Sequence, residues 1–229
     1  FMGDKMENII NKLFLTISGV LVIGAGFFFY QTRPLSAPTA NIQDVVSRIG
    51  ENGKLLTIDS SKSEAQFSLN EVLRGVPTLV VGTTSQLAGD ILIESENPFK
   101  IKIGEIKINA KTLKTDSTQR DGAIGRMILK SEDPVNEFIV FTPKEILDLP
   151  GQVEKNKEFS FKINGDLLIK GITKPVTFNT KATQNEDGSW IAIADTNVAY
   201  ADFGISVPNF PFLADVDEIV NLKISLFLR

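Results

Sequence analysis

Apolar and polar residues alternate with a period of two over much of the chain. The clearest run is the C-terminal one, where every second residue from Val220 to Leu228 is apolar. Shorter runs of the same kind cover residues 159–163 and 176–178. This period places one face of a β-strand against a core and the other in water. Turn signals between the runs then predict a closed antiparallel barrel or a β-sandwich; they are Asn97-Pro98, Asn164-Gly165 and Asn185–Gly188.

A change of phase interrupts one of these strands. Ile101 and Ile103 alternate in one phase, whereas Ile106 and Ile108 alternate in the other. The switch falls at Gly104-Glu105, and we expect a β-bulge there that redirects the strand.

One segment has the period of a helix instead. Residues 119–130 place Ile124, Met127 and Ile128 on one helical face, and Thr118 and Asp121 have the spacing of a capping box. We expect a short helix that lies across the barrel or closes one of its ends.

An uncharged apolar stretch lies near the N-terminus, at residues 13–32. As a helix, its apolar part would be about 27 Å long, close to the thickness of a bilayer core. Lys5 and Lys12 precede the stretch and only Arg33 closely follows it, which favours a cytoplasmic tail at residues 1–12. We therefore expect a transmembrane signal-anchor at 13–32. A cleaved signal peptide and a buried core helix are the alternatives.

The remainder of the chain divides into a tether and a domain. Residues 33–54 contain two prolines and two glycines among polar residues, which is typical of a linker. Residues 55–229 are long enough for one domain with a substantial core. This division predicts a single-pass protein of the cell membrane whose domain lies on the extracytoplasmic side.

Composition excludes several kinds of chemistry. The 229 residues include no cysteine and no histidine, which rules out disulfides, thiol nucleophiles, zinc fingers and Ser-His-Asp triads. The formal net charge is −4, and the lysines are scattered along the chain, so no nucleic-acid partner is expected. We expect no enzyme, cofactor or metal, although a pair of catalytic carboxylates stays open as a minor alternative.

Three short motifs have a structural explanation and a chemical one. The tripeptide Asp202–Gly204 matches a kinase motif by letter but is better explained as a strand end before a glycine. An acidic cluster of Asp215, Asp217 and Glu218 lacks the spacing of a calcium loop and favours a solvated turn. Arg120-Asp121 is either a buried bridge between helix and barrel rim or a holder of a polar ligand head group.

The order of further motifs resembles the YceI-like family of polyisoprenoid-binding, lipocalin-like proteins. The resemblance covers residues 55–229. The motifs that carry it are Leu56–Asp59, Ser63–Phe67, Val81–Thr84 with Leu87–Gly89, Ile106–Leu113 with Thr115-Asp116 and Arg120-Asp121, Gly165–Phe178, and Tyr200–Ile205. The chain departs from better-known members at Lys62-Ser63, in the region where those members often have a histidine, and this bears on any polar contact to a head group.

The resemblance implies an all-β, eight-stranded antiparallel barrel with one short helix and a long apolar cavity that holds an isoprenoid chain. A small barrel can also fill its interior with side chains, and the alternation alone does not decide between the two. We expect a non-enzymatic lipid-binding protein; the alternative is a surface-displayed structural or interaction domain with a solid core. The expected partners are an isoprenoid or other long-chain lipid, the membrane and, in a homodimer, a second copy. The predicted cavity lining is Phe67, Ile108, Phe141, Phe161, Phe178, Trp190 and Tyr200.

Overall fold

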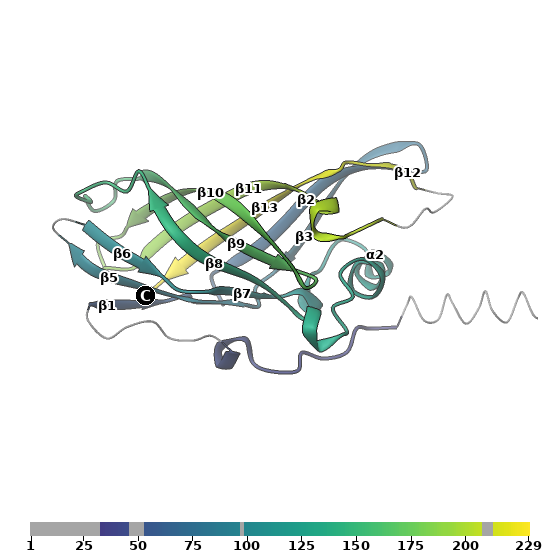
Figure 1. Ribbon diagram of the computed structural model, residues 1–229, viewed down its shortest axis with the longest axis horizontal. Coiled ribbons are helices and arrows are strands. Elements are labelled where there is room, and N and C mark those ends of the chain that lie inside the picture. The colour runs from purple at the N-terminus through teal and green to yellow at the C-terminus, as the bar shows by residue number, and fades with distance from the viewer. Residues whose placement is uncertain (1–32, 46–52, 97–98, 208–212) are drawn as a thin grey trace, which may run out of the picture. The chain divides into compact units, whose positions relative to one another are not determined.

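Antiparallel β-strands make up most of the protein in a computed structural model, which describes residues 33–45, 53–96, 99–207 and 213–229 (Figure 1). The strands are β1 (Lys54–Thr57), β2 (Glu64–Leu73), β3 (Val76–Thr84), β4 (Leu87–Ala88), β5 (Asp90–Glu96), β6 (Phe99–Ile103), β7 (Ile106–Asn109), β8 (Phe138–Leu147), β9 (Phe159–Ile169), β10 (Ile172–Gln184), β11 (Trp190–Ala199), β12 (Leu213–Val216) and β13 (Ile219–Leu228). The helical elements are α2 (Thr118–Ala123), the π-helical turn η3 (Ile124–Ile128) and the 3-10 turns η1 (Ile42–Val45), η2 (Ala110–Thr112), η4 (Pro134–Asn136) and η5 (Tyr200–Phe203).

Two sheets form a nearly closed barrel. The larger sheet has the order β12-β2-β13-β11-β10-β9-β8-β7-β4, and β3 pairs with β2. The smaller sheet has the order β1-β5-β6. The two sheets join where the Thr57 and Arg229 backbones exchange hydrogen bonds of 2.9 and 3.2 Å. On the side of β6 away from β5, the one backbone hydrogen bond within the described residues runs from Phe99 N–H to the Gly151 carbonyl (2.7 Å).

The predicted all-β class and the short helix are confirmed, but the predicted count of eight strands is wrong. Thirteen strands are present in the described part of the chain because bends divide the longer ones. One bend lies at Gly104-Glu105, where the phase switch predicts it: β6 pairs with β5 before it, and β7 pairs with β4 and β8 after it. Because the pairing partners change at this bend, β6 belongs to the smaller sheet and β7 belongs to the larger one.

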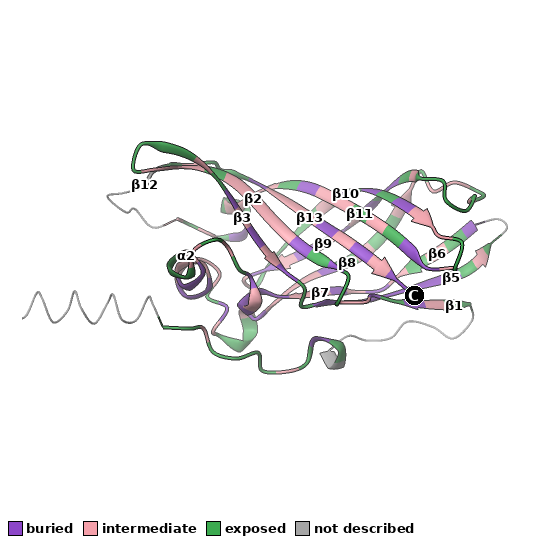
Figure 2. Cartoon of the chain, turned by 180° about the vertical axis from the view of Figure 1, so that it is seen from behind, coloured by how far each residue is buried: buried purple, intermediate pink, exposed green. Residues whose placement is uncertain are grey.

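Alternating burial along the strands builds the core (Figure 2). In β9, Phe161, Ile163 and Leu167 are buried while their neighbours face outward. The predicted turn at Asn164-Gly165 is wrong, because these residues lie within β9 and the chain turns after Ile169. Gly165 instead leaves room for an aromatic neighbour, since a Cβ atom there would lie 2.6 Å from the Phe141 ring.

The helical segment begins one residue earlier than its sequence indicates. The N-cap is Ser117, whose hydroxyl accepts a hydrogen bond from Arg120 N–H, and α2 passes directly into η3. Asp121 does not complete a capping box; its carboxylate accepts hydrogen bonds from the backbone and side chain of Thr115 at 2.7 and 2.8 Å. The segment confirms the predicted helix but not the predicted cap.

The expected N-terminal tail (1–12) and membrane span (13–32) lie outside the described residues. Among those that are described, no helix is long and apolar enough to cross a bilayer. The C-terminal part of the described 33–45 segment contacts the barrel: Ile42 is buried, and Thr39 donates two hydrogen bonds to Glu137. Part of the expected linker therefore belongs to the domain.

Candidate functional site

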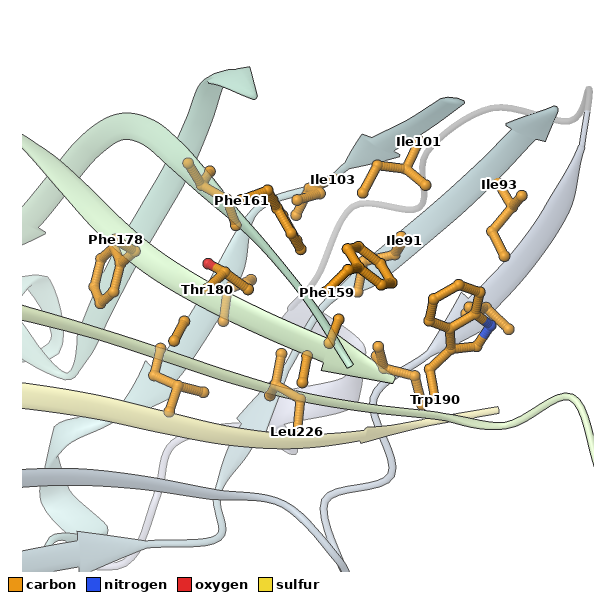
Figure 3. Close-up of a pocket in the computed structure, with 18 of the residues that line it drawn as sticks. Ile91, Ile93, Ile101, Ile103, Phe159, Phe161, Phe178, Thr180, Trp190 and Leu226 are labelled. Carbon is orange, nitrogen blue, oxygen red and sulfur yellow. The ribbon is translucent and has the colours of Figure 1, made fainter. Parts of the chain in front are cut away.

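An apolar cavity lies inside the barrel between the two sheets (Figure 3). Its volume is about 70 Å³, and no charged side chain lines it. The lining residues are Leu56, Ile91, Ile93, Phe99, Ile101, Ile103, Ile106, Phe141, Phe159, Phe161, Ile163, Phe178, Thr180, Ala182, Trp190, Ala192, Ala194, Ile224, Leu226 and Leu228.

Strand register explains which side chains reach the cavity. Thr180 on β10 pairs with Phe161 on β9 and with Ala194 on β11, so the three share the inward face. Ala182, Ala192 and Ala194 also line the cavity, and their small side chains leave space beside the larger apolar residues. The outward neighbour Ile193 is exposed, as the period of two requires.

Aromatic rings fill one end of the cavity. Phe99 from the smaller sheet stacks on Trp190 with ring centroids 5.6 Å apart and an interplanar angle of 14°. Phe159 meets both rings edge to face, at 6.0 and 6.2 Å. Phe159 also stacks on Phe161 at 5.7 Å. These contacts join the two sheets through side chains at a place where few backbone hydrogen bonds join them.

The cavity is small for a ligand site. Pockets that bind drug-sized ligands usually measure roughly 300–1,000 Å³, against the 70 Å³ found between these walls. The interior is therefore neither a solid core nor an open lumen. A long ligand would have to move the sheets or the rings apart.

Two residues of the cavity wall each have a buried polar atom without a hydrogen-bond partner among the described residues, and neither atom faces the cavity, whose surface is apolar throughout. The two atoms are the Thr180 hydroxyl and the Trp190 indole Nε1. Both residues are more than nine-tenths buried, at 4% and 5% exposed. An unpaired buried donor costs roughly 1–3 kcal/mol, so a polar partner for each would be favourable.

Four of the seven residues predicted to line the cavity do so, and three do not. Phe141, Phe161, Phe178 and Trp190 are in the wall. Phe67 packs against Gly82 at the β2–β3 hairpin, Ile108 supports the core cluster from β7, and Tyr200 begins η5. The wall residues of β5 and β6 were not predicted, although Ile91, Ile93, Ile101 and Ile103 alternate clearly enough to be found.

Arg120 and Asp121 lie outside the cavity and bind different partners. Arg120 contacts Glu71 of β2 at 2.9 Å and also pairs with Asp116. The Asp121 carboxylate accepts a hydrogen bond from the Thr115 hydroxyl, and Lys114 Nζ lies 3.7 Å from Asp121 Oδ2. These contacts fit the structural role that the sequence leaves open for the pair, in which the helix is tied to the barrel rim.

Of the three acidic residues near the C-terminus, Asp215 lies in β12, and Asp217 and Glu218 form the turn between β12 and β13. Asp217 accepts hydrogen bonds from the backbone and side chain of Asn70, at 3.3 and 2.8 Å, and thereby fixes the bend between β12 and β13. In the described ranges, no group of three or more carboxylates gathers as a metal site would require. Asp202 lies in η5, and Gly204 ends that turn with a φ of 60°.

A buried polar cluster that sequence analysis missed lies beside the barrel. Lys111 Nζ is 3.1 Å from Glu137 Oε2, and Asn109 and Thr39 also donate to this carboxylate. Burial raises the pKa of Glu137, but the hydrogen bonds from Thr39, Lys111 and Asn109 outweigh it, so the pKa lies below its usual range. None of these residues lines the cavity.

Comparisons of sequence place this barrel among known proteins. A sequence model of the YceI-like domain matches residues 56–228. A UPF0312 protein of Serratia proteamaculans is 26% identical over 147 residues, which cover 62% of this chain and 71% of that protein. Protein YceI of Escherichia coli is 26% identical over 151 residues, which cover 62% and 72%.

Comparisons of structure find the same fold. A polyisoprenoid binding domain from Saccharophagus degradans, implicated in plant cell wall breakdown, superimposes with a TM-score of 0.59 at 12% identity, covering 76% of this chain and 97% of that domain. BcnA from Burkholderia cenocepacia superimposes with a TM-score of 0.57 at 15% identity, covering 74% and 98%. The match of the family's sequence model over residues 56–228 shows that the chain belongs to the YceI-like family, and the similarity of fold agrees with it.

Proposed function

We propose that the protein binds an isoprenoid or similar long-chain lipid inside the barrel, without catalysing a reaction on it. The observation that carries this proposal is the cavity itself, whose wall is made of apolar side chains from both sheets. The similarity to a polyisoprenoid binding domain supports the same class of ligand.

Burial of the lipid tail would supply the affinity. Each CH₂ group that leaves water contributes about 0.8 kcal/mol. A wall without charged side chains lets a hydrocarbon chain enter without desolvating ions. Specific contacts to a head group are therefore not needed for binding, although they would select among lipids.

The ligand has to enlarge the cavity. The side of β6 that faces β8 offers a place for this, because it makes one backbone hydrogen bond there, to Gly151, within the described residues. The loop that carries Gly151 also places Leu149 and Val153 against the core cluster. Movement of this loop and of β6 would widen the cavity and leave the pairing of β8 to β11 intact.

The proposal also includes the location of the domain. The apolar residues 13–32 would hold the chain in the cell membrane, and the charge distribution around them would place the barrel on the extracytoplasmic side. A barrel held near a bilayer would exchange lipid with it over a short distance. Protease protection of the full chain in membrane vesicles would test this part independently of lipid binding.

The test of lipid binding compares two variants of the full chain. Ala194→Leu adds three carbon atoms at the cavity wall, and Ile193→Leu is the matched control on the outward face of the same strand. The chains are purified from an isoprenoid-producing host, examined by native mass spectrometry and extracted with solvent. We expect bound lipid in wild type and Ile193→Leu, and much less in Ala194→Leu. A wild-type chain that stays free of lipid after incubation with farnesol would favour an interaction domain with a packed core.

A further inference from the structure

Exposed apolar side chains gather at one end of the barrel, the end that carries α2. They are Val76, Leu79, Ile172 and Ile219, which are between 37% and 62% exposed. Ile191 and Ile193 are exposed too, but they lie near the start of β11, toward the opposite end. Figure 1 shows α2 and β12 at one end and β5 and β6 at the other. Exposed apolar residues that gather in this way mark a candidate contact surface.

Contacts through η5 bring two of these residues to the same rim. Ile172, at the start of β10, lies against Gly204, because a Cβ atom there would be 2.8 Å from Ile172 Cδ1. Tyr200, at the start of η5, donates its backbone N–H to the Glu218 carbonyl at 3.3 Å, and Ile219 follows directly. The turn between β9 and β10 and the start of β13 are therefore joined at this end.

The β2–β3 hairpin adjoins the same place. Asn70 of β2 pairs with Leu79 of β3, and its carbonyl accepts a hydrogen bond from Asp217 N–H at 2.9 Å, two residues before Ile219. Val76 begins β3 at the tip of the hairpin. We call Val76, Leu79, Ile172 and Ile219 the apolar rim.

The chain also enters the domain at this end. Leu35 packs against η3, since a Cβ atom at Gly125 would lie 2.6 Å from Leu35 Cδ1. The α2 helix, which passes directly into η3, is joined to β2 through Arg120 and Glu71 at 2.9 Å. Glu71 is three residues before the turn of the hairpin, so Leu35 and the apolar rim belong to one end of the barrel.

The distance along the sequence from the expected anchor to this end is short. The uncharged stretch 13–32 ends three residues before Leu35. Three extended residues span at most about 11 Å. In the proposed membrane location, this connection holds the α2 end of the domain close to the bilayer surface.

The tip of the β2–β3 hairpin has a composition that suits the head-group region of a bilayer. Arg74 is exposed at the turn, with a φ of 51°, and residues 75–81 carry no charge. Aliphatic side chains enter the interface favourably, and the guanidinium group matches a phosphate. Asp215 pairs with Val72 close to the turn, so the local charges roughly balance. Phosphatidylcholine, which has no net charge, is therefore the lipid surface that fits.

We propose that the apolar rim and Arg74 contact the surface of the bilayer that holds the anchor, so that the domain stands with its α2 end on the lipid head groups. This inference rests on the proposed membrane location and adds to it the contact surface and the orientation of the barrel. Aliphatic carbon that leaves water at the rim would stabilise the contact.

Fluorescent labels on the full chain in phosphatidylcholine vesicles test this orientation. The sequence has no cysteine, so each variant carries one label, the environment-sensitive dye NBD. Ile172→Cys and Leu79→Cys report on the rim. Ile193→Cys and Ile191→Cys are the matched controls, which are also exposed aliphatic positions on strands. We expect bluer emission, and severalfold stronger quenching by nitroxide-labelled phosphatidylcholine, at the two rim positions.

Charged substitutions separate contact through the rim from the effect of the short connection alone. Val76→Glu combined with Leu79→Glu should weaken the quenching at position 172 severalfold, because carboxylates are unfavourable among lipid chains. Ile191→Glu combined with Ile193→Glu is the matched control and should leave the quenching unchanged. Leu79→Glu alone serves if the double variant folds poorly.

Each outcome bears on a different claim. Equal quenching at both ends, stronger quenching at positions 191 and 193, or quenching at position 172 that survives the rim glutamates would overturn this inference and leave the membrane location standing. A full chain that does not float with vesicles in a density gradient would remove the membrane location, and this inference with it. Lipid binding inside the barrel would be unaffected by that result.

Discussion

Lys111 and Glu137 form an ion pair that is almost completely removed from solvent. The Nζ–Oε2 distance is 3.1 Å, and the side chains are 2% and 0% exposed. The two residues are 26 positions apart; Lys111 lies in η2 and Glu137 lies between η4 and β8, so the pair fixes one segment against the other. Thr39 and Asn109 complete the hydrogen bonding of the carboxylate.

Removal of one partner should be strongly destabilising. Lys111→Met leaves the Glu137 carboxylate buried without its counterion, and we expect the free energy of unfolding to fall by about 3–5 kcal/mol in urea denaturation. Glu158→Gln, which breaks the exposed pair with Lys181, is the control and should change it by less than about 1 kcal/mol. Similar losses in both variants would show that burial of the pair does not matter.

Stability should depend on pH through the same carboxylate. The pKa of Glu137 in the folded protein is lowered from the ordinary value of 4.5, so the unfolded chain binds a proton more readily. The stabilisation is therefore complete above the unfolded-state pKa and is lost as the pH falls through the folded-state pKa. Denaturation of wild type and Glu137→Gln between pH 6 and 3, a range set around that value, should show a shallower loss in the variant. Parallel curves would contradict this assignment.

Gly82 and Phe67 form a tight contact between β3 and β2. A Cβ atom at position 82 would overlap the Phe67 ring, so Gly82→Ala should destabilise the protein by about 1–3 kcal/mol. Gly151→Ala is the matched control, because no atom lies within 4 Å of a Cβ atom there. Combining Gly82→Ala with Phe67→Leu should recover part of the loss in thermal denaturation, since leucine vacates the ring's position. No recovery would mean that the cost lies in the backbone.

Arg120 should contribute to stability and not to lipid affinity. Its guanidinium joins α2 to Glu71 of β2, and both side chains are mostly buried, at 17% and 10% exposed. We expect Arg120→Ala to cost about 1–2 kcal/mol in urea denaturation and to leave the calorimetric affinity for farnesol unchanged. A large loss of affinity in a folded variant would instead support a head-group role.

Local alternation predicted the parts of the fold that depend on neighbouring residues. It identified the C-terminal strand and the change of direction at Gly104-Glu105, because the inward face of a strand repeats every second residue. The predicted β-bulge is wrong in kind, since these two residues separate β6 from β7 and do not lie within one paired strand. The Asn-Gly turn signal failed at Asn164-Gly165, where the glycine makes room for the Phe141 ring of the adjacent strand and does not form a turn. That contact depends on how β8 and β9 are aligned with each other, and the sequence of one strand alone does not determine this alignment.

The same reason explains the mixed outcome at the candidate site. Phe161, Phe178 and Trp190 lie in long, regular strands and reach the cavity as predicted. Phe67 lies on a regular strand too, but no residue of β2 lines the cavity, and the Phe67 ring packs against Gly82 of β3. The Lys111–Glu137 pair involves residues whose charge normally indicates a surface position, and only the tertiary structure reveals that they are buried.

In the proposed lipid-binding role, the smaller sheet, β1-β5-β6, would determine how large a ligand the barrel accepts. It supplies Leu56, Ile91, Ile93, Phe99, Ile101 and Ile103 to the wall. In the described residues, its backbone hydrogen bonds to the rest of the barrel are confined to the ends, near Arg229 and Gly151. Cooperative opening of this sheet should therefore need less free energy than global unfolding, and hydrogen exchange should be faster at β6 than at β10. The upper limit on ligand length would then be set by the free energy needed to displace these three strands from the rest of the barrel.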